Sequence, residues 1–187
     1  MTESGSAHDQ YFKLSFGQPE AAAELVRHYL PAEVVAHIDL ASLERRAGSF
    51  VDEELRGQQG DLLFRARLRE GGEAQIYLLL EHKSYRDRLV AFQLLRYCVR
   101  IWERDRRERP RQGLRPIVPL VVYNGPEGWQ ALSFEDLFEG PEALRRYWPR
   151  FDFELLDLPE KDAEEIVGEV RFASRSWHCE RCGGRAA

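Results

Sequence analysis

The stretch that decides the fold is Ile76-Tyr77-Leu78-Leu79-Leu80-Glu81-His82-Lys83, near the middle of the chain. Its first five residues are apolar at every position, which is typical of an interior β-strand covered on both faces. Three polar residues then end the apolar run abruptly. The stretch therefore predicts a buried strand that carries polar side chains at its carboxyl end.

A second strand is predicted just before this one. From Asp61 to Arg69 the residues alternate in the two-residue period of a half-covered strand, with one face formed by Leu62, Phe64, Ala66 and Leu68. Gly71-Gly72 between the two segments suits a tight hairpin turn. We therefore expect the two strands to pair antiparallel, with Asp61 at the start of one arm and Glu81 at the end of the other.

A long helix is expected after the hairpin. Asp87 is a candidate N-cap or first-turn acid, and apolar residues then recur with helical spacing at Ala91, Leu94, Leu95, Cys98, Ile101 and Trp102. Residues 117–123 predict another strand. Pro119 cannot donate a hydrogen bond to a sheet, so this strand is expected to start late, to bulge or to have an open side there.

The segment before the hairpin predicts a helical lead-in. Helical spacing begins at Pro19, is interrupted at Leu30-Pro31, and resumes in a second helix that reaches about Arg46. The order of elements predicts an α/β fold, a mixed β-sheet with an antiparallel hairpin flanked by helices. A chain of 187 residues, 43% of them hydrophobic, suits one such domain.

Composition excludes several classes of protein. Charged residues make up 32% of the chain, and no apolar stretch approaches the roughly 18 residues that a membrane span needs. The first residues do not form a secretory signal, so we expect a cytoplasmic location and no membrane partner. Three cysteines cannot build a disulfide framework. The sequence leaves the oligomeric state open.

The net charge of −5 conceals an asymmetry along the chain. Residues 86–115 contain ten arginines and four acidic residues, whereas residues 127–169 contain thirteen acidic and four basic residues. Because phosphate binding depends on where positive charge is concentrated, overall acidity does not exclude DNA as a partner. The acidic stretch leaves open a second reading, in which Glu135, Asp136 and Glu139 help to dock a basic protein.

Three separated residues form the candidate catalytic site. Asp61 begins one hairpin strand, and Glu81 and Lys83 lie two residues apart at the end of the other, so the pleat puts these two on one face. Two carboxylates on adjacent strands, with the main-chain carbonyl of His82, can hold Mg²⁺ beside a phosphodiester. Lys83 would then orient or deprotonate the attacking water, or stabilise charge on the phosphate.

This arrangement resembles the PD-(D/E)XK nuclease signature, since nineteen residues separate Asp61 from Glu81-x-Lys83. Several longer phrases at matching spacing are similar to the recombination-promoting nuclease family, also labelled the YhgA-like transposase family. The similarity covers residues 8 to about 173. The phrases are His8-Asp9-x-x-Phe12-Lys13, Leu30-Pro31, Ser49-Phe50-Val51-Asp52, Asp61-Leu62-Leu63, Leu79-Leu80-Glu81-His82-Lys83-Ser84, Leu95-Arg96-Tyr97 and Val118-Pro119-Leu120-Val121-Val122-Tyr123-Asn124-Gly125.

The resemblance implies a restriction-endonuclease-like core and Mg²⁺-dependent DNA endonuclease activity that promotes recombination, with Mn²⁺ able to replace Mg²⁺. By position, Asp61 and Glu81 are the implied metal ligands and Lys83 the third catalytic residue. Gln93-x-x-x-Tyr97 places two polar groups one helical turn apart, as in some nucleases of this superfamily. These two residues are candidate substrate contacts.

Other features of the sequence have a purely structural interpretation as well as a functional one. The arginine cluster that includes Arg104 and Arg107 could contact a DNA backbone, or could be only a solvated helix end. Residues 8–173 are expected to form the nuclease-like domain, followed by a short disordered tail at 174–187, where His178-Cys179-x-x-Cys182 offers half a zinc site. A catalytically inactive module that binds nucleic acid or another protein remains the alternative function.

Overall fold

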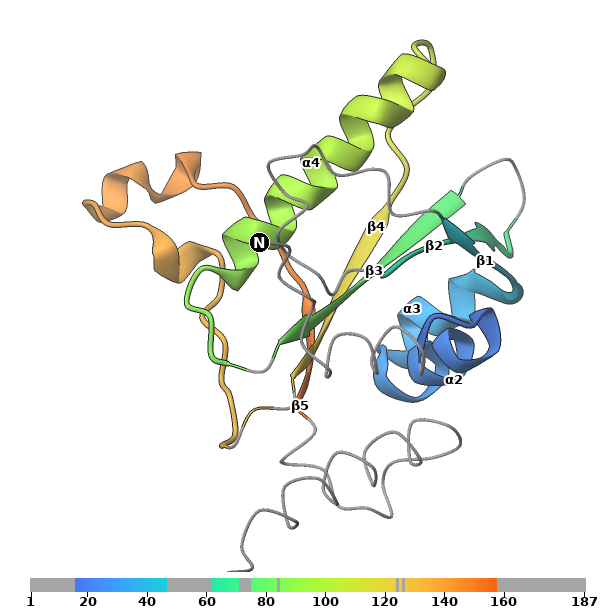
Figure 1. Ribbon diagram of the computed structural model, residues 1–187. Helices are drawn as coiled ribbons and strands as arrows, with labels where there is room; N and C mark the ends of the chain where they lie inside the picture. Colours follow the sequence, from blue (N-terminus) through green and yellow to red (C-terminus); the bar gives the residue numbers. More distant parts are fainter. Residues whose placement is uncertain are drawn as a thin grey trace, which may run out of the picture.

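A computed structural model of the chain describes residues 16–46, 62–70, 75–83, 85–123, 125 and 127–157. Within these residues, five strands form one sheet in the order β1-β2-β3-β4-β5 (Figure 1). The bounds of the strands are Ile38–Arg46 for β1, Leu62–Leu68 for β2, Gln75–Lys83 for β3, Ile117–Tyr123 for β4 and Glu154–Asp157 for β5.

The sheet is mixed, because its two halves pair in different senses. Strands β1, β2 and β3 are antiparallel neighbours, whereas β3, β4 and β5 run parallel. The predicted pairing of the two hairpin strands is confirmed, with Leu62 opposite Leu80 and Arg67 opposite Gln75. The mixed α/β class predicted from the sequence is likewise confirmed.

Helices cover both faces of the sheet (Figure 1). The helices α2 (Pro19–Tyr29) and α3 (Ala32–His37) lie on one face, and α4 (Val90–Glu108) lies on the other. The alternation of β2 divides its apolar residues between these layers, since Phe64 packs with α2 and Leu63 packs with α4. The interruption predicted at Leu30-Pro31 is confirmed as the break between α2 and α3.

The prediction of a helix reaching Arg46 is wrong, because residues 38–46 form strand β1. The buried residues Ile38, Leu40 and Leu43 all belong to the core beneath α2. Their spacing of two and then three residues imitates a helix. It arises here from an irregularity in the pairing with β2 between Asp39 and Glu44, which brings Leu43 back to the inner face.

Strand β4 accommodates Pro119 through an open side. Its register with β3 is unbroken from Ile117 to Tyr123, but the pairing with β5 begins only at Leu120. Pro119 therefore lies just outside the part of β4 that has neighbours on both sides. Of the three arrangements predicted for this proline, the open side is the one observed. Beyond the strand, Gly125 lies against the Tyr123 ring, where a Cβ atom would collide with the phenol group.

The segment after β4 forms an extension held together by aromatic contacts (Figure 1). Trp129 is buried and meets the Tyr123 ring edge-on, with 5.0 Å between the ring centroids. The Trp148 ring stacks on that of Phe138, with 5.2 Å between the centroids. Trp129 and Trp148 thus act as packing residues of this extension. The extension contains the short 3₁₀ helices η2 (Glu135–Leu137) and η3 (Glu142–Tyr147).

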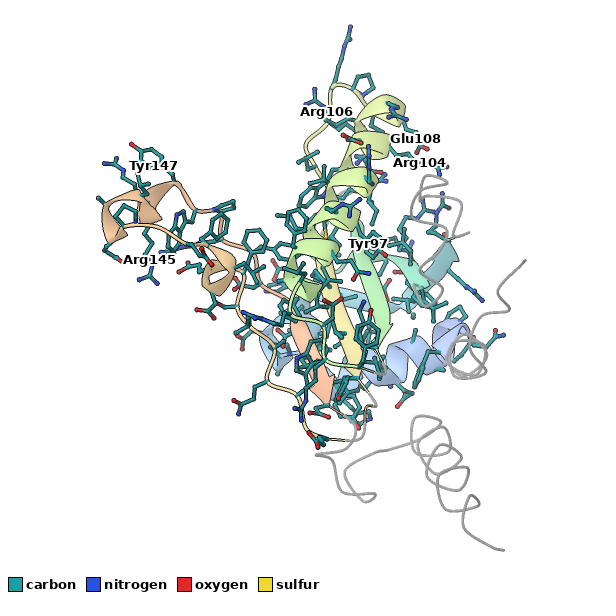
Figure 2. All side chains as sticks on the ribbon, turned by 60° about the vertical axis from the view of Figure 1, so that its left-hand side comes forward. Tyr97, Arg104, Arg106, Glu108, Arg145 and Tyr147 are labelled. Atoms are coloured by element: carbon teal, nitrogen blue, oxygen red, sulfur yellow. The ribbon has the colours of Figure 1, made fainter. Side chains whose placement is uncertain are left out.

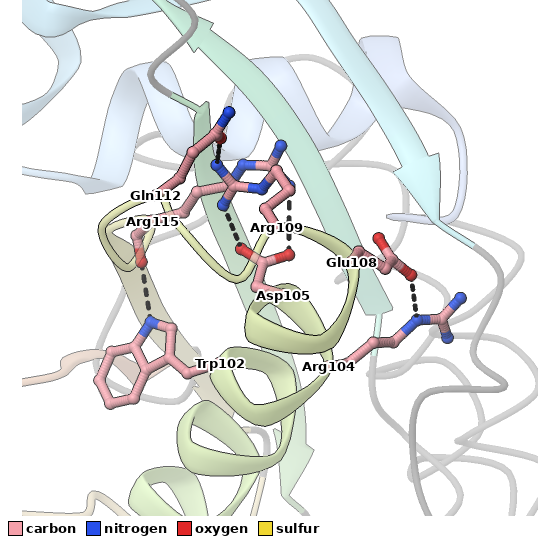
Figure 3. A network of polar contacts seen from close by, with 7 residues as sticks. All are labelled: Trp102, Arg104, Asp105, Glu108, Arg109, Gln112 and Arg115. Carbon is pink, nitrogen blue, oxygen red and sulfur yellow. Dashed lines mark hydrogen bonds and ion pairs between the residues drawn. The ribbon is translucent and has the colours of Figure 1, made fainter.

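Asp105 fastens the end of α4 to the chain that leads into β4 (Figure 3). Its buried carboxylate accepts hydrogen bonds from Arg109 at 3.0 Å and from Arg115 at 3.1 Å. The indole of Trp102 also donates to the main-chain oxygen of Arg115 at 2.8 Å. A buried carboxylate is costly unless it is paired, so these contacts compensate for its loss of hydration.

We predict that Asp105→Ala lowers the free energy of unfolding by about 3 kcal/mol, because it removes the carboxylate between two partly buried arginines. Glu108→Ala is the matched control, since Glu108 makes an exposed ion pair with Arg104 and its loss should cost at most about 0.5 kcal/mol. Urea unfolding followed by circular dichroism measures both values. Equal stabilities for the two variants would contradict this role of Asp105.

Within the described ranges, no helix has the length and apolar character that crossing a membrane requires. The tail at residues 174–187 lies outside these ranges, as does the predicted turn at Gly71-Gly72.

Candidate active site

Lys83 ends strand β3 and lies buried between the sheet and α4, with 5% of its surface exposed. In the parallel register it pairs with Tyr123, whose side chain belongs to the core beneath α4. A lysine ammonium rarely becomes this buried unless hydrogen-bond acceptors surround it. The sequence prediction that Lys83 lies at the carboxyl end of this strand is confirmed.

Two side chains of the following segment accept hydrogen bonds from Lys83. Its Nζ atom lies 3.2 Å from Oδ2 of Asp87 and 2.8 Å from Oε1 of Gln93. Gln93 in turn donates from Nε2 to the hydroxyl of Tyr97 at 2.9 Å. The four residues therefore form one connected polar network, in which the ammonium of Lys83 is held by a carboxylate and an amide oxygen.

Helix α4 brings Gln93 and Tyr97 into this network. The two residues are four positions apart, and in a helix that spacing puts both side chains on one face. Both are buried, and Figure 2 shows Tyr97 on the part of α4 that lies beside the sheet. The predicted pairing of two polar groups one turn apart is confirmed, whereas their role as substrate contacts stays a prediction.

Asp87 does not cap α4 in the way that the sequence suggested. The N-cap residue is Leu89, and no side chain caps it. Asp87 instead lies in the loop, where its Oδ1 accepts a hydrogen bond from the main-chain N–H of Leu89 at 2.9 Å. Its other oxygen is thereby left oriented toward Lys83. Sequence reasoning missed this contact, whose one signal is the four-residue spacing between Lys83 and Asp87.

An aromatic ring lies on the solvent side of the same ammonium. Tyr85 is 59% exposed, and its ring centroid is 5.4 Å from Nζ of Lys83. A cation over an aromatic face is attracted by the ring quadrupole. Lys83 thus lies between the acceptors Asp87 and Gln93 on the side of α4 and a ring that reaches solvent.

Of the two predicted carboxylate residues, Glu81 lies in a described part of the backbone and Asp61 does not. Glu81 and His82 lie within β3, where their backbones pair with Val121 and Val122, but their side chains are outside the described structure. Asp61 also falls outside the described residues. The association of Asp61 with Glu81, and the ligand role of the His82 carbonyl, therefore stay predictions.

Other metal-binding or nucleophilic groups do not gather in the part of the chain that the structure describes. No group of three or more His, Cys, Asp or Glu residues there could hold a metal ion. Cys98 lies on the buried stripe of α4, as the sequence predicted, and burial raises the pKa of its thiol to about 12. A buried thiol that stays protonated at neutral pH is a poor nucleophile.

Some arginines at the carboxyl end of α4 make structural contacts, and others lie at the surface. Arg104 pairs with Glu108 at 2.9 Å, and Arg109 bonds to the buried Asp105. Arg107 is exposed, and Figure 2 shows Arg104 and Arg106 at the end of α4 that lies away from the N-terminal turns. The roles of Arg104 and Arg107 as DNA contacts stay predictions, whereas Arg109 has a structural role.

We predict that Tyr97→Phe lowers the free energy of unfolding by about 1 to 2 kcal/mol, because it deletes the acceptor of a buried hydrogen bond from Gln93. Tyr147→Phe is the control, since Tyr147 is 73% exposed. Thermal unfolding of both variants measures the difference. If the two substitutions change stability equally, the hydrogen bond between Gln93 and Tyr97 makes no measurable contribution to stability, which would contradict this prediction.

Comparison with curated proteins finds relatives over most of the chain. It is 33% identical over 169 residues to recombination-promoting nuclease RpnD of Escherichia coli O157:H7, covering 89% of this chain and 64% of that protein. It is 31% identical over 173 residues to recombination-promoting nuclease RpnA of Escherichia coli K12. This alignment covers 91% of this chain and 58% of that protein. The chain thus spans about three fifths of the length of these relatives.

One relative carries a different description. The inactive recombination-promoting nuclease-like protein RpnE of Escherichia coli K12 is 29% identical over 177 residues, which cover 92% of this chain and 58% of that protein. No solved structure matches the chain significantly. The family model described as "Putative transposase, YhgA-like" matches residues 6–176, and the chain therefore belongs to that family.

Proposed function

We propose that this chain is a metal-dependent DNA endonuclease that acts in recombination. In this proposal Asp61 and Glu81 bind Mg²⁺ and Lys83 is the third catalytic residue. The observation that carries it is the position of Lys83, a buried lysine fixed by hydrogen bonds at the end of a strand whose antiparallel partner begins one residue after Asp61. The names of the relatives RpnD and RpnA support nuclease chemistry.

The register of β2 and β3 supports the pairing of the two acids. The last described pair is Leu62 with Leu80, so Asp61 and Glu81 are the next residues of the two strands in sequence. Alternation along a strand puts every second position on the same face. We propose that this alternation continues to position 61, so that positions 61 and 81 share a face with Leu63 and Lys83, which lie on the side of α4.

The donor set fits a hard divalent cation. It consists of two carboxylates and the main-chain oxygen of His82, and oxygen ligands of this kind suit Mg²⁺. Asp87 is a weaker candidate ligand, because its carboxylate already bonds Lys83 and the Leu89 N–H. When bound, Mg²⁺ would neutralise phosphate charge and acidify a coordinated water.

The residues of the chain itself supply position and charge. Lys83 has its ammonium held by acceptors of α4 and of the preceding loop, so it can orient the attacking water or stabilise negative charge on the phosphate without first reorganising. Gln93 and Tyr97 form the buried support of that lysine and are proposed to lie next to the substrate. Arg104 and Arg107 are proposed to contact DNA phosphates farther along α4.

The topology supports a restriction-endonuclease-like core as part of this proposal. Strands β2 and β3 form an antiparallel pair, and α4 then connects β3 to its parallel neighbour β4. A parallel connection requires such a crossover, which packs the helix on the face of the sheet that carries Lys83. The proposed site therefore lies where hairpin and crossover helix meet.

A plasmid-cleavage assay in Mg²⁺ tests the function directly. We predict cleavage by the unaltered chain, and loss of at least about a thousandfold in rate for Asp61→Ala and Glu81→Ala, because each removes a ligand that acts on the reacting phosphate. Glu142→Ala is the control, since the Glu142 side chain is 82% exposed and pairs only loosely with Arg145, at 3.6 Å.

Removal of metal by EDTA should abolish cleavage, and added Mn²⁺ should restore it. Cleavage by Asp61→Ala and Glu81→Ala at the unaltered rate would refute their proposed roles. The relative described as inactive motivates a second candidate, a DNA-binding module without catalysis. Salt-sensitive DNA binding without metal-dependent cleavage in the same preparation would favour that candidate.

A further inference from the structure

We propose that Asp87 is a positioning residue for Lys83, one that fixes the ammonium against the start of α4 so that it faces the substrate in a single orientation. This inference rests on the proposed nuclease function, because the role of Asp87 is exerted through Lys83. It assigns a function to a residue that sequence reasoning treated only as a helix cap.

The two oxygens of Asp87 join two different parts of the molecule. Oδ2 lies 3.2 Å from Nζ of Lys83, at the end of β3. Oδ1 accepts from the N–H of Leu89, and the main-chain oxygen of Asp87 accepts from the N–H of Val90 at 3.2 Å. Asp87 therefore connects the ammonium directly to the first residues of α4 rather than to a freely moving loop.

The burial of the pair makes this contact effective. The Lys83 side chain is 5% exposed and the Asp87 side chain 19% exposed, so water screens their attraction much less than in a surface ion pair. A lysine side chain has four rotatable bonds and loses considerable freedom when it is held in one geometry. Asp87 and Gln93 approach Nζ from neighbouring parts of the chain and together restrict that freedom.

A capping role alone does not account for the arrangement. The residue at the N-cap is Leu89, and a bond from Asp87 to the main chain two residues later needs only one carboxylate oxygen. The second oxygen has no part in the loop geometry and is directed at Lys83. Asp87→Asn is therefore an informative change, because the amide oxygen can still accept from Leu89 while the charge opposite Lys83 is lost.

Steady-state cleavage in Mg²⁺ is the first test. We expect Asp87→Asn to lower kcat by about tenfold to a hundredfold and to leave KM within about twofold, because DNA contacts elsewhere are unaltered. The matched control is Glu127→Gln, which neutralises an acid paired with exposed Arg86 at 2.7 Å and should leave both constants unchanged. A melting temperature within a few degrees of the unaltered chain separates this loss from unfolding.

A double-mutant cycle distinguishes positioning from an independent role. If Asp87 acts through Lys83, Asp87→Asn should cause no further loss in a Lys83→Met background. A multiplicative loss in that background would overturn the proposal, because Asp87 would then act on its own, for example as a metal ligand or a purely structural residue. An unchanged kcat for Asp87→Asn in a chain that cleaves DNA would overturn it as well.

Chemical acetylation gives a readout that does not depend on cleavage. The chain has three lysines, Lys13, Lys83 and Lys161, so peptide mass spectrometry can follow each after treatment with sulfo-N-hydroxysuccinimidyl acetate. We expect Asp87→Asn to speed the acetylation of Lys83 at least about fivefold and to leave the other two unchanged. If the unaltered chain fails to cleave DNA, the proposed function fails, and this measurement still decides the inference, since an unchanged Lys83 rate would overturn it.

Discussion

The position of β3 between an antiparallel and a parallel neighbour is the constraint on which the rest of the structure depends. The antiparallel partner β2 can follow through a short hairpin, whereas the parallel partner β4 requires a crossover of about a dozen residues or more. That crossover is α4, which packs across the sheet and brings Gln93 and Tyr97 over the last residue of β3. The polar network around Lys83 is a direct consequence of this topology.

The network exists because a buried lysine needs hydrogen-bond acceptors in place of water. An ammonium surrounded by apolar side chains would be strongly destabilising, and here a carboxylate and an amide oxygen offset the loss of water. The surrounding core on this face includes Val121 and Tyr123 of β4 and Leu94 of α4. A charge held beside such a core keeps one orientation, which suits the contact with phosphate that we propose for Lys83.

Much of this architecture could be predicted from the sequence because its elements are long and regular. The apolar run of β3, the alternation of β2 and the stripe of α4 each repeat a clear period. Strand β1 could not be predicted in this way, because the irregularity between Asp39 and Glu44 changes its spacing from two to three residues. Strand β5 is four residues long, too short to show a period of its own.

The candidate site could be predicted only in part. Lys83, Gln93 and Tyr97 were recognisable because strand-end position and helical spacing are local properties of the sequence. The contacts of Asp87 with Lys83 and of Asp105 with Arg115 were not, because each crosses a loop whose path the sequence does not specify. The arginine cluster near the end of α4 likewise needed the structure to separate Arg109, bonded to a buried acid, from exposed Arg107.

The most direct test of the central claim is a crystal of the chain soaked in Mn²⁺ and measured by anomalous scattering. The account predicts one strong peak coordinated by the carboxylates of both Asp61 and Glu81, with Lys83 close by. A peak at another location, or two carboxylates too far apart to share one ion, would contradict it.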